Sequence, residues 1–136
     1  MASKVKNRPP TRKEIEKTRK RLLVRKSELW EEVWEILDRE AREEYQDWIE
    51  TMRDEGDVAL AELKESTLFS FIDIKVEELE MIEGALNRIE EGEYGRCIDC
   101  GQLIQPGRLE IMPHALRCRD CQGQQEKIEK IDRGST

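Results

Sequence analysis

The sequence predicts a mainly α-helical protein, in which a long antiparallel helical hairpin (a coiled coil) is followed by a small cysteine-rich module and a short C-terminal helix. Three observations predict this fold. Two stretches carry apolar residues at spacings of three and four, which is the period of one helix face. Only 37% of the 136 residues are hydrophobic and 40% are charged, which suits helices that bury one narrow stripe. Four cysteines form two C-x-x-C pairs in the last third of the chain.

The first helix of the hairpin follows a basic arm over residues 1–11. Thr11 fits an N-cap, and Glu14 stands three residues later in the capping-box pattern. Because neither Gly nor Pro interrupts the sequence from Ile15 to Met52, the spacing predicts one continuous helix. Its apolar positions are Ile15, Leu22, Leu29, Val33, Leu37, Ala41, Tyr45, Trp48 and Met52.

The second helix pairs with the first and completes the hairpin over residues 12–92. Gly56 permits a positive φ and Asp57 can cap the next helix, so the tip of the hairpin is expected at residues 53–59. At 1.5 Å per residue, this second arm would be roughly 50 Å long. Its apolar positions are Ala61, Leu68, Ile72, Val76, Leu79, Ile82, Leu86 and Ile89.

Some segments fall outside this pairing. The residues before Arg19 extend beyond the hairpin and are expected to pack on the segment after Gly92. Trp30 and Trp34 share a helix face, which indicates packing. Three further apolar residues lie off the second seam, where they would either broaden the core or form a contact patch. These are Phe69, Phe71 and Ile74.

The four cysteines are the clearest chemical signal, and they lie in a predicted module over residues 93–136. Cys97 and Cys100 form one pair, Cys118 and Cys121 form the other, and 17 residues separate the two pairs. This spacing is typical of a zinc site, in which four thiolates close a tetrahedron and leave no position for a substrate. The sequence therefore predicts one structural zinc ion. Two disulfides are a poor alternative in a cytoplasmic chain, and no βαβ pattern supports a redox pair.

The rest of the module is expected to be small and regular. Residues 103–111 are predicted to form a β-hairpin around a Pro-Gly turn. Residues 122–131 are predicted to form a short helix with Ile128 and Ile131 facing inward. His114 lies between the cysteine pairs and is interpreted as a polar loop residue beside the metal site.

Charge is distributed unevenly along the chain. The net charge is −7, yet residues 1–26 carry 11 Lys/Arg against 2 Glu, and residues 38–66 carry 11 Asp/Glu against 4 Lys/Arg. A mostly acidic chain is poorly suited to wrap a nucleic-acid backbone, whose binding depends on released counterions. No apolar segment approaches the roughly 20 residues of a membrane span or follows the basic start as a secretory signal would. A cytoplasmic protein is expected.

The order of these features resembles the DksA/TraR family of bacterial transcription factors. The resemblance rests on Asp54-x-x-Asp57-x-Ala59 at the bend of a helical hairpin, followed by the four-cysteine finger. It implies a monomer that binds RNA polymerase directly, without recognising a DNA sequence. In this family the hairpin enters the secondary channel of the polymerase and its tip alters the stability of the open promoter complex. By the same resemblance, Asp54, Asp57 and Ala59 would contact the active-centre region.

Some members of this family act together with the alarmone ppGpp in the stringent response. The resemblance places the corresponding basic positions at Met81, Met112 and Gln122, none of which can pair with a phosphate. Weak or absent dependence on ppGpp is therefore expected, unless nearby cations such as Arg108 or Arg119 compensate.

Two other functions stay open. A Gre-like transcript-cleavage factor would also send acidic residues into the channel, where they would hold a second metal ion. A zinc-ribbon nucleic-acid module would depend on the arginines near the finger, at positions Arg96, Arg108, Arg117 and Arg119. The chain shows no nucleophile–base pair, phosphate loop or open metal site, so an autonomous enzyme is not expected.

Overall fold

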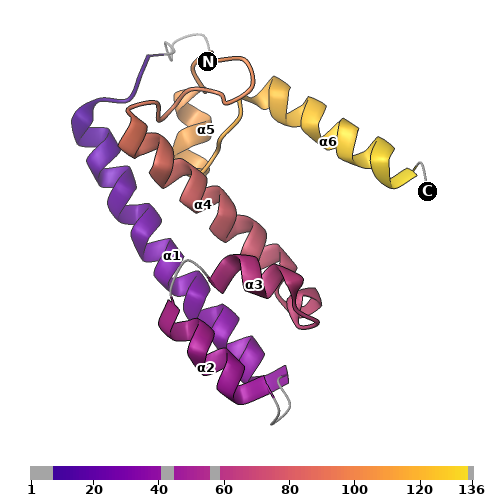
Figure 1. Ribbon diagram of the computed structural model, residues 1–136. Coiled ribbons are helices and arrows are strands. Elements are labelled where there is room, and N and C mark those ends of the chain that lie inside the picture. Colours follow the sequence, from indigo (N-terminus) through magenta and orange to yellow (C-terminus); the bar gives the residue numbers. More distant parts are fainter. Residues whose placement is uncertain (1–7, 41–44, 56–58, 135–136) are drawn as a thin grey trace. The chain divides into compact units, whose positions relative to one another are not determined.

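The computed structural model describes residues 8–40, 45–55 and 59–134, and it confirms the mainly α-helical fold (Figure 1). Within those residues the only β contact is an isolated antiparallel bridge between Arg96 and Leu103. The helices are α1 (Arg12–Glu40), α2 (Gln46–Glu55), α3 (Ala59–Glu65), the 3-10 helix η4 (Phe69–Phe71), α4 (Asp73–Glu91), α5 (Pro106–Ile111) and α6 (Arg119–Gly134). No described helix is both long enough and apolar enough to span a membrane.

The chain divides into two compact units. We call Met1–Leu22 together with Met81–Thr136 the finger unit, and Leu23–Glu80 the helical unit. The boundaries between them fall inside α1 and α4, so each long helix contributes one part to each unit.

The start of α1 confirms the predicted capping box. The Glu14 backbone N–H donates to the Thr11 hydroxyl at 3.2 Å, and the Thr11 backbone N–H donates to the Glu14 carboxylate at 2.9 Å. The guanidinium of Arg8 also binds this carboxylate, with N–O distances of 2.7 and 3.1 Å. Together these donors lower the pKa of Glu14 to about 2, the hydrogen bond from Arg8 having the largest effect.

In the helical unit, α1 and α4 pair in the predicted antiparallel sense. Arg25 binds Glu78 at 2.6 Å, and one to two turns further along α1, Glu32 binds Lys75 at 2.8 Å. As the residue number rises on one helix it falls on the other, which only an antiparallel pair allows. The side chains buried in this unit are Leu29, Val33, Leu37, Ile49, Met52, Leu63, Leu68, Ile72, Val76 and Leu79.

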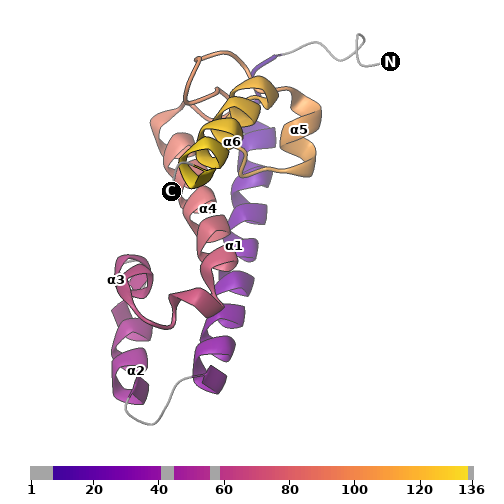
Figure 2. The ribbon, with the colours of Figure 1, turned by 90° about the vertical axis from the view of Figure 1, so that its right-hand side faces the viewer.

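The prediction of one continuous first helix is wrong. The helix α1 ends at Glu40, and α2 runs back beside it (Figures 1 and 2). Arg53 near the end of α2 binds Asp38 at 3.1 Å, and its guanidinium lies 5.1 Å from the centre of the Trp34 ring. The buried side chains of α2 are Ile49 and Met52. Of the apolar positions predicted for this segment, Met52 is buried, whereas Tyr45 and Trp48 are half-buried.

The helix break predicted at residues 53–59 is present, because α2 ends at Glu55 and α3 begins at Ala59. It is not where the first arm reverses, because α2 already runs back along α1 and Arg53 binds Asp38. The two turn residues, Gly56 and Asp57, lie outside the described residues.

The aromatic residues of the helical unit are placed as follows. Trp30 and Trp34 stack with their ring centres 5.2 Å apart, as expected for packing side chains. Phe71 and Ile74 are 52% and 77% exposed, so they do not broaden the hairpin core. Phe69 is half-buried.

Candidate metal centre

The finger begins where α4 ends, and glycine makes that ending possible. Gly92 has a φ of +74°, and the backbone N–H groups of Gly92 and Glu93 donate to the carbonyls of Ile89 and Arg88 at 3.1 and 2.8 Å. This is the Schellman pattern, which satisfies the last carbonyls of a helix and turns the chain sharply.

The first cysteine pair lies in a tight backbone loop. The Cys97 N–H donates to the Gln102 carbonyl at 2.8 Å, and the Gly101 N–H donates back to the Cys97 carbonyl at 3.0 Å. Gly101 has a φ of +76°, which a residue with a side chain adopts only at a cost. The bridge between Arg96 and Leu103 closes the loop behind the cysteines.

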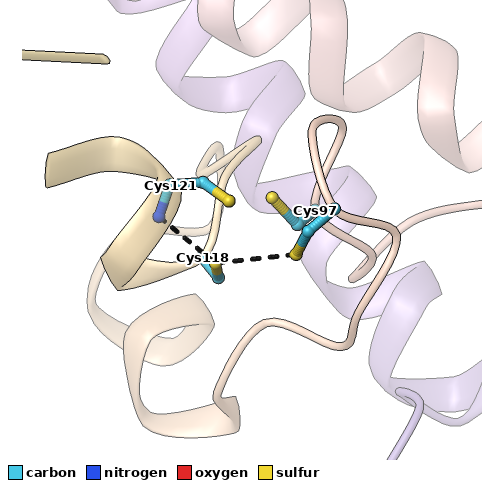
Figure 3. Close-up of side chains that lie close together, drawn as sticks. Cys97, Cys118 and Cys121 are labelled. Atoms are coloured by element: carbon cyan, nitrogen blue, oxygen red, sulfur yellow. Dashed lines mark hydrogen bonds between the residues drawn. The ribbon is translucent and has the colours of Figure 1, made fainter. Parts of the chain in front are cut away.

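The second pair lies at the start of α6. The Cys121 N–H points at the sulfur of Cys118 across 3.5 Å, and the Gln122 N–H donates to the Cys118 carbonyl at 2.9 Å. The two loops are joined by the Ile98 N–H, which donates to the Leu116 carbonyl at 2.9 Å. In Figure 3 the sulfurs of Cys97, Cys118 and Cys121 converge on one space.

The four sulfurs fit a zinc ion. All four Sγ atoms, those of Cys97, Cys100, Cys118 and Cys121, lie within 4.8 Å of one another. A tetrahedron with Zn–S bonds of about 2.3 Å would place its sulfurs about 3.8 Å apart, and the Sγ atoms of Cys100 and Cys118 are 3.9 Å apart. That separation is far beyond the roughly 2.05 Å of a disulfide, and all four cysteines are free thiols. The predicted structural zinc site is therefore confirmed, and the alternative of two disulfides is not.

The pKa values of the cysteine thiols bear on whether the site can bind a cation. Burial alone would raise the pKa of Cys97, but hydrogen bonds from the backbone of Cys100, Cys118 and Asp99 outweigh burial and lower it to about 6. Hydrogen bonds with the sulfurs of Cys118 and Cys97 favour the protonated thiol of Cys121 and raise its pKa, and charge repulsion from Cys97 adds a smaller contribution. Zinc binds the deprotonated form of cysteine, so metal binding would release these protons.

Two predictions about the rest of the finger are wrong. Residues 106–111 form the helix α5, not the second half of a β-hairpin, because Pro106 occupies the first helical position, where its missing N–H costs nothing. The C-terminal helix is present as α6 and is longer than predicted, but Ile128 and Ile131 are 53% and 68% exposed instead of facing inward.

His114 is half-buried, and the cluster of possible metal ligands among the described residues consists of the four cysteines without it. Asp99, between the first two cysteines, accepts a hydrogen bond of 2.7 Å from Arg117 and so ties the two cysteine loops together.

Tyr94 was not singled out from the sequence, yet it is buried in the finger unit and contacts two other segments of it. Tyr94 is 7% exposed, and its hydroxyl donates to the Pro113 carbonyl at 2.8 Å. Burial raises its pKa to about 12, although a hydrogen bond with Thr18 of α1 opposes that shift. This contact confirms that residues before Arg19 pack on the segment after Gly92. The sequence feature that could have pointed to Tyr94 is its position, three residues before the first cysteine of the finger.

The three predicted tip residues belong to the helical unit. Asp54 is exposed in the last turn of α2, and Ala59 is the first residue of α3. Asp57 lies outside the described residues.

Comparison with known proteins agrees with this site. Residues 92–127 match the family of the prokaryotic dksA/traR C4-type zinc finger. Over 121 residues the chain is 29% identical to the RNA polymerase-binding transcription factor DksA of Caulobacter vibrioides, which covers 89% of this chain and 82% of that protein. The finger segment thus matches the dksA/traR C4-type zinc-finger family, and the chain as a whole is similar to DksA.

Two further similarities complete the comparison. An uncharacterized protein of Aquifex aeolicus is 28% identical over 116 residues, which cover 85% of this chain and 77% of that protein. The structure of the transcription factor DksA2 from Pseudomonas aeruginosa matches the fold with a TM-score of 0.57, at 23% identity and with 95% of each chain covered. The chain therefore resembles DksA2 in fold, and its finger segment matches the four-cysteine finger family in sequence.

Proposed function

We propose that this chain is a transcription regulator that binds bacterial RNA polymerase directly and acts through its secondary channel. The supporting observation is the four-sulfur finger, which joins the chain to a family whose Caulobacter member is named for binding RNA polymerase. The zinc ion is structural in this proposal. It holds the finger together and takes no part in chemistry, because four protein ligands fill its tetrahedron.

The acidic segment between α2 and α3 is the proposed effector. Asp54 is exposed at the end of α2, and Asp57 follows three residues later in the sequence. Carboxylates delivered beside the polymerase active centre would change its electrostatic field and so change the stability of the open complex. Ala59 would lie against that region at the first turn of α3.

The test separates binding from effect. Purified polymerase should capture the full chain, and a photo-crosslinker at position 55 should join it to residues that line the secondary channel. Replacing Asp54→Asn together with Asp57→Asn should abolish the effect on initiation in a transcription assay while polymerase capture persists. The matched control is Asp47→Asn with Glu50→Gln, which removes two exposed charges from the same helix, one to two turns before Asp54. Equal loss of effect in the control would refute the role of the tip.

A transcript-cleavage assay decides between this function and a Gre-like factor. Efficient release of short transcripts from stalled elongation complexes would indicate cleavage and would overturn the regulator proposal. A nucleic-acid module is disfavoured, because three of the four finger arginines donate internally. Arg96 donates to the Gly101 carbonyl at 3.2 Å, Arg108 to the Arg117 carbonyl at 3.1 Å, and Arg117 to Asp99 at 2.7 Å.

We also propose that ppGpp affects this protein weakly or not at all. Met81, Met112 and Gln122 offer no cation, and Gln122 donates to Glu126 at 3.2 Å. Of the two arginines that could compensate, Arg108 is half-buried and donates to the Arg117 carbonyl, whereas Arg119 is exposed. Strong potentiation of the factor by ppGpp in a transcription titration would refute this part of the proposal.

A further inference from the structure

The finger unit contains a groove of about 430 Å³ between the first turns of α1 and the segment after α4. Its apolar surface is formed by one tyrosine, one leucine and two prolines, namely Tyr94, Leu109, Pro10 and Pro106. The volume lies within the range of ordinary binding pockets, roughly 300–1,000 Å³.

The walls of this groove are fixed. Both prolines have a restricted φ, and the Tyr94 hydroxyl donates to the Pro113 carbonyl, which fixes the tyrosine, 7% exposed, in the wall of the groove. Pro10 approaches so closely to Gly95 that a Cβ on this glycine would lie 2.9 Å from the proline Cδ. A ligand would therefore meet a preformed apolar surface and would pay little to order it.

The edge of the groove is positively charged. Arg8 and Glu14 neutralise each other across 2.7 Å. The remaining charged residues that line the groove are two cations, Lys17 and Arg21, and one acid, Glu110. Neither cation forms an ion pair with a residue that the structure describes, and a spacing of four places both on one face of α1.

We propose that this groove binds an acidic segment of RNA polymerase. One apolar side chain of that segment would pack against Tyr94, and its carboxylates would form ion pairs with Lys17 and Arg21. The inference adds a second contact to the proposed complex and so rests on the proposed function. The positive charge of the groove favours an acidic partner. Its apolar surface favours a protein segment over a nucleic acid, because proteins bind a phosphate backbone through a series of cations. Glu110 on the edge would also repel phosphates.

The first test measures polymerase affinity with the full chain. Reversing both charges with Lys17→Glu and Arg21→Glu should weaken polymerase binding by roughly tenfold and make the affinity depend less on salt concentration. The matched control reverses Lys13→Glu and Lys20→Glu, two exposed lysines of α1 that do not line the groove, and should weaken binding by less than about threefold. Zinc content and the melting temperature verify that both variants fold. Equal weakening by the two pairs would overturn the proposal.

The second test needs no polymerase. A pentapeptide with a central phenylalanine flanked by glutamates should shift the NMR amide signals of Thr18 and Gly95, and a peptide with a central glycine should shift them less. A single-stranded oligonucleotide that binds the groove more tightly than the phenylalanine peptide would overturn the assignment to a protein segment. If the wild-type chain fails to bind polymerase, the proposed function fails, and the peptide shifts alone decide whether the groove accepts acidic segments.

Discussion

The two units of this chain differ in charge and in what holds them together. The finger unit carries 17 Lys/Arg and 12 Asp/Glu, whereas the helical unit carries 7 and 19. Among the described residues, nine of the twelve largest fully buried side chains belong to the helical unit and three to the finger unit. The difference teaches that the finger unit, with fewer large buried side chains, depends on a metal ion as well as on apolar packing, whereas an apolar seam suffices in the helical unit.

The largest effect is expected from loss of the zinc site. Replacing Cys97→Ser with Cys100→Ser should expel the metal and unfold the finger unit, because binding of a structural zinc contributes about 10–16 kcal/mol in zinc-finger peptides. The helical unit should keep its helices. Circular dichroism, zinc content and a thermal melt measure this, and a chelator added to the wild-type chain should reproduce it. An unchanged melt would contradict the assignment of a structural zinc.

The next effect concerns the apolar seam of the helical unit. Replacing Leu37→Ala should lower the free energy of unfolding by about 2–5 kcal/mol, because it leaves a cavity at a fully buried position. Zinc content should not change. The matched control is Leu23→Ala on the same helix, where the side chain is 41% exposed and the loss should be smaller. Denaturant unfolding compares the two, and equal losses would mean that the seam does not hold this unit.

A smaller effect tests the packing of α1 on the finger. Replacing Gly95→Ala should cost about 1–3 kcal/mol, because φ is +92° and the new Cβ would overlap Pro10. Replacing Gly92→Ala is the control, since its φ of +74° is also positive and nothing lies within 4 Å of the new Cβ. The difference between the two unfolding free energies isolates the Pro10 contact. If Gly92→Ala costs as much, that contact contributes nothing.

The sequence predicted those parts of the molecule that depend on local chemistry. The Thr11 capping box and the four-sulfur cluster follow from residue type and spacing alone, and the structure confirms both. The seam positions Leu29, Val33 and Leu37 are also buried as predicted. In each case the pattern has one stable solution.

Prediction from the sequence was wrong where one pattern of apolar residues is compatible with two different structures. A stripe with a spacing of four describes one long helix or two helices that fold back, and Arg53 binding to Asp38 and Trp34 favours the second. Residues 103–111 are too short for periodicity to separate a strand from a helix, and the helix-starting proline at position 106 was the neglected signal. The exposed side chains of Ile128 and Ile131 show that helical spacing alone does not prove burial.

The smallest effect concerns pH and the first turn of α1, where the finger unit begins. The folded-state pKa of Glu14 is about 2, below its ordinary value of 4.5, because Arg8 and Thr11 donate hydrogen bonds to the ionised carboxylate. A lowered pKa means that the stabilisation is complete above pH 4.5 and is lost as pH falls through about 2. The carboxyl carbon of Glu14 should therefore show no titration by NMR between pH 7 and pH 4.

The control for this prediction removes the donor. Replacing Arg8→Ala should move the titration midpoint of Glu14 upward toward 4.5, because the largest contribution to the shift is its hydrogen bond. Replacing Glu14→Gln should abolish the pH dependence of the α1 start while the cysteine cluster, which shares no residue with this turn, keeps its metal at neutral pH. A midpoint near 4.5 in the wild-type chain would show that the ion pair and the cap are not formed in solution. In that case the contacts of α1 with the finger would rest on the approach of Pro10 to Gly95 and on the packing of Thr18 and Leu22.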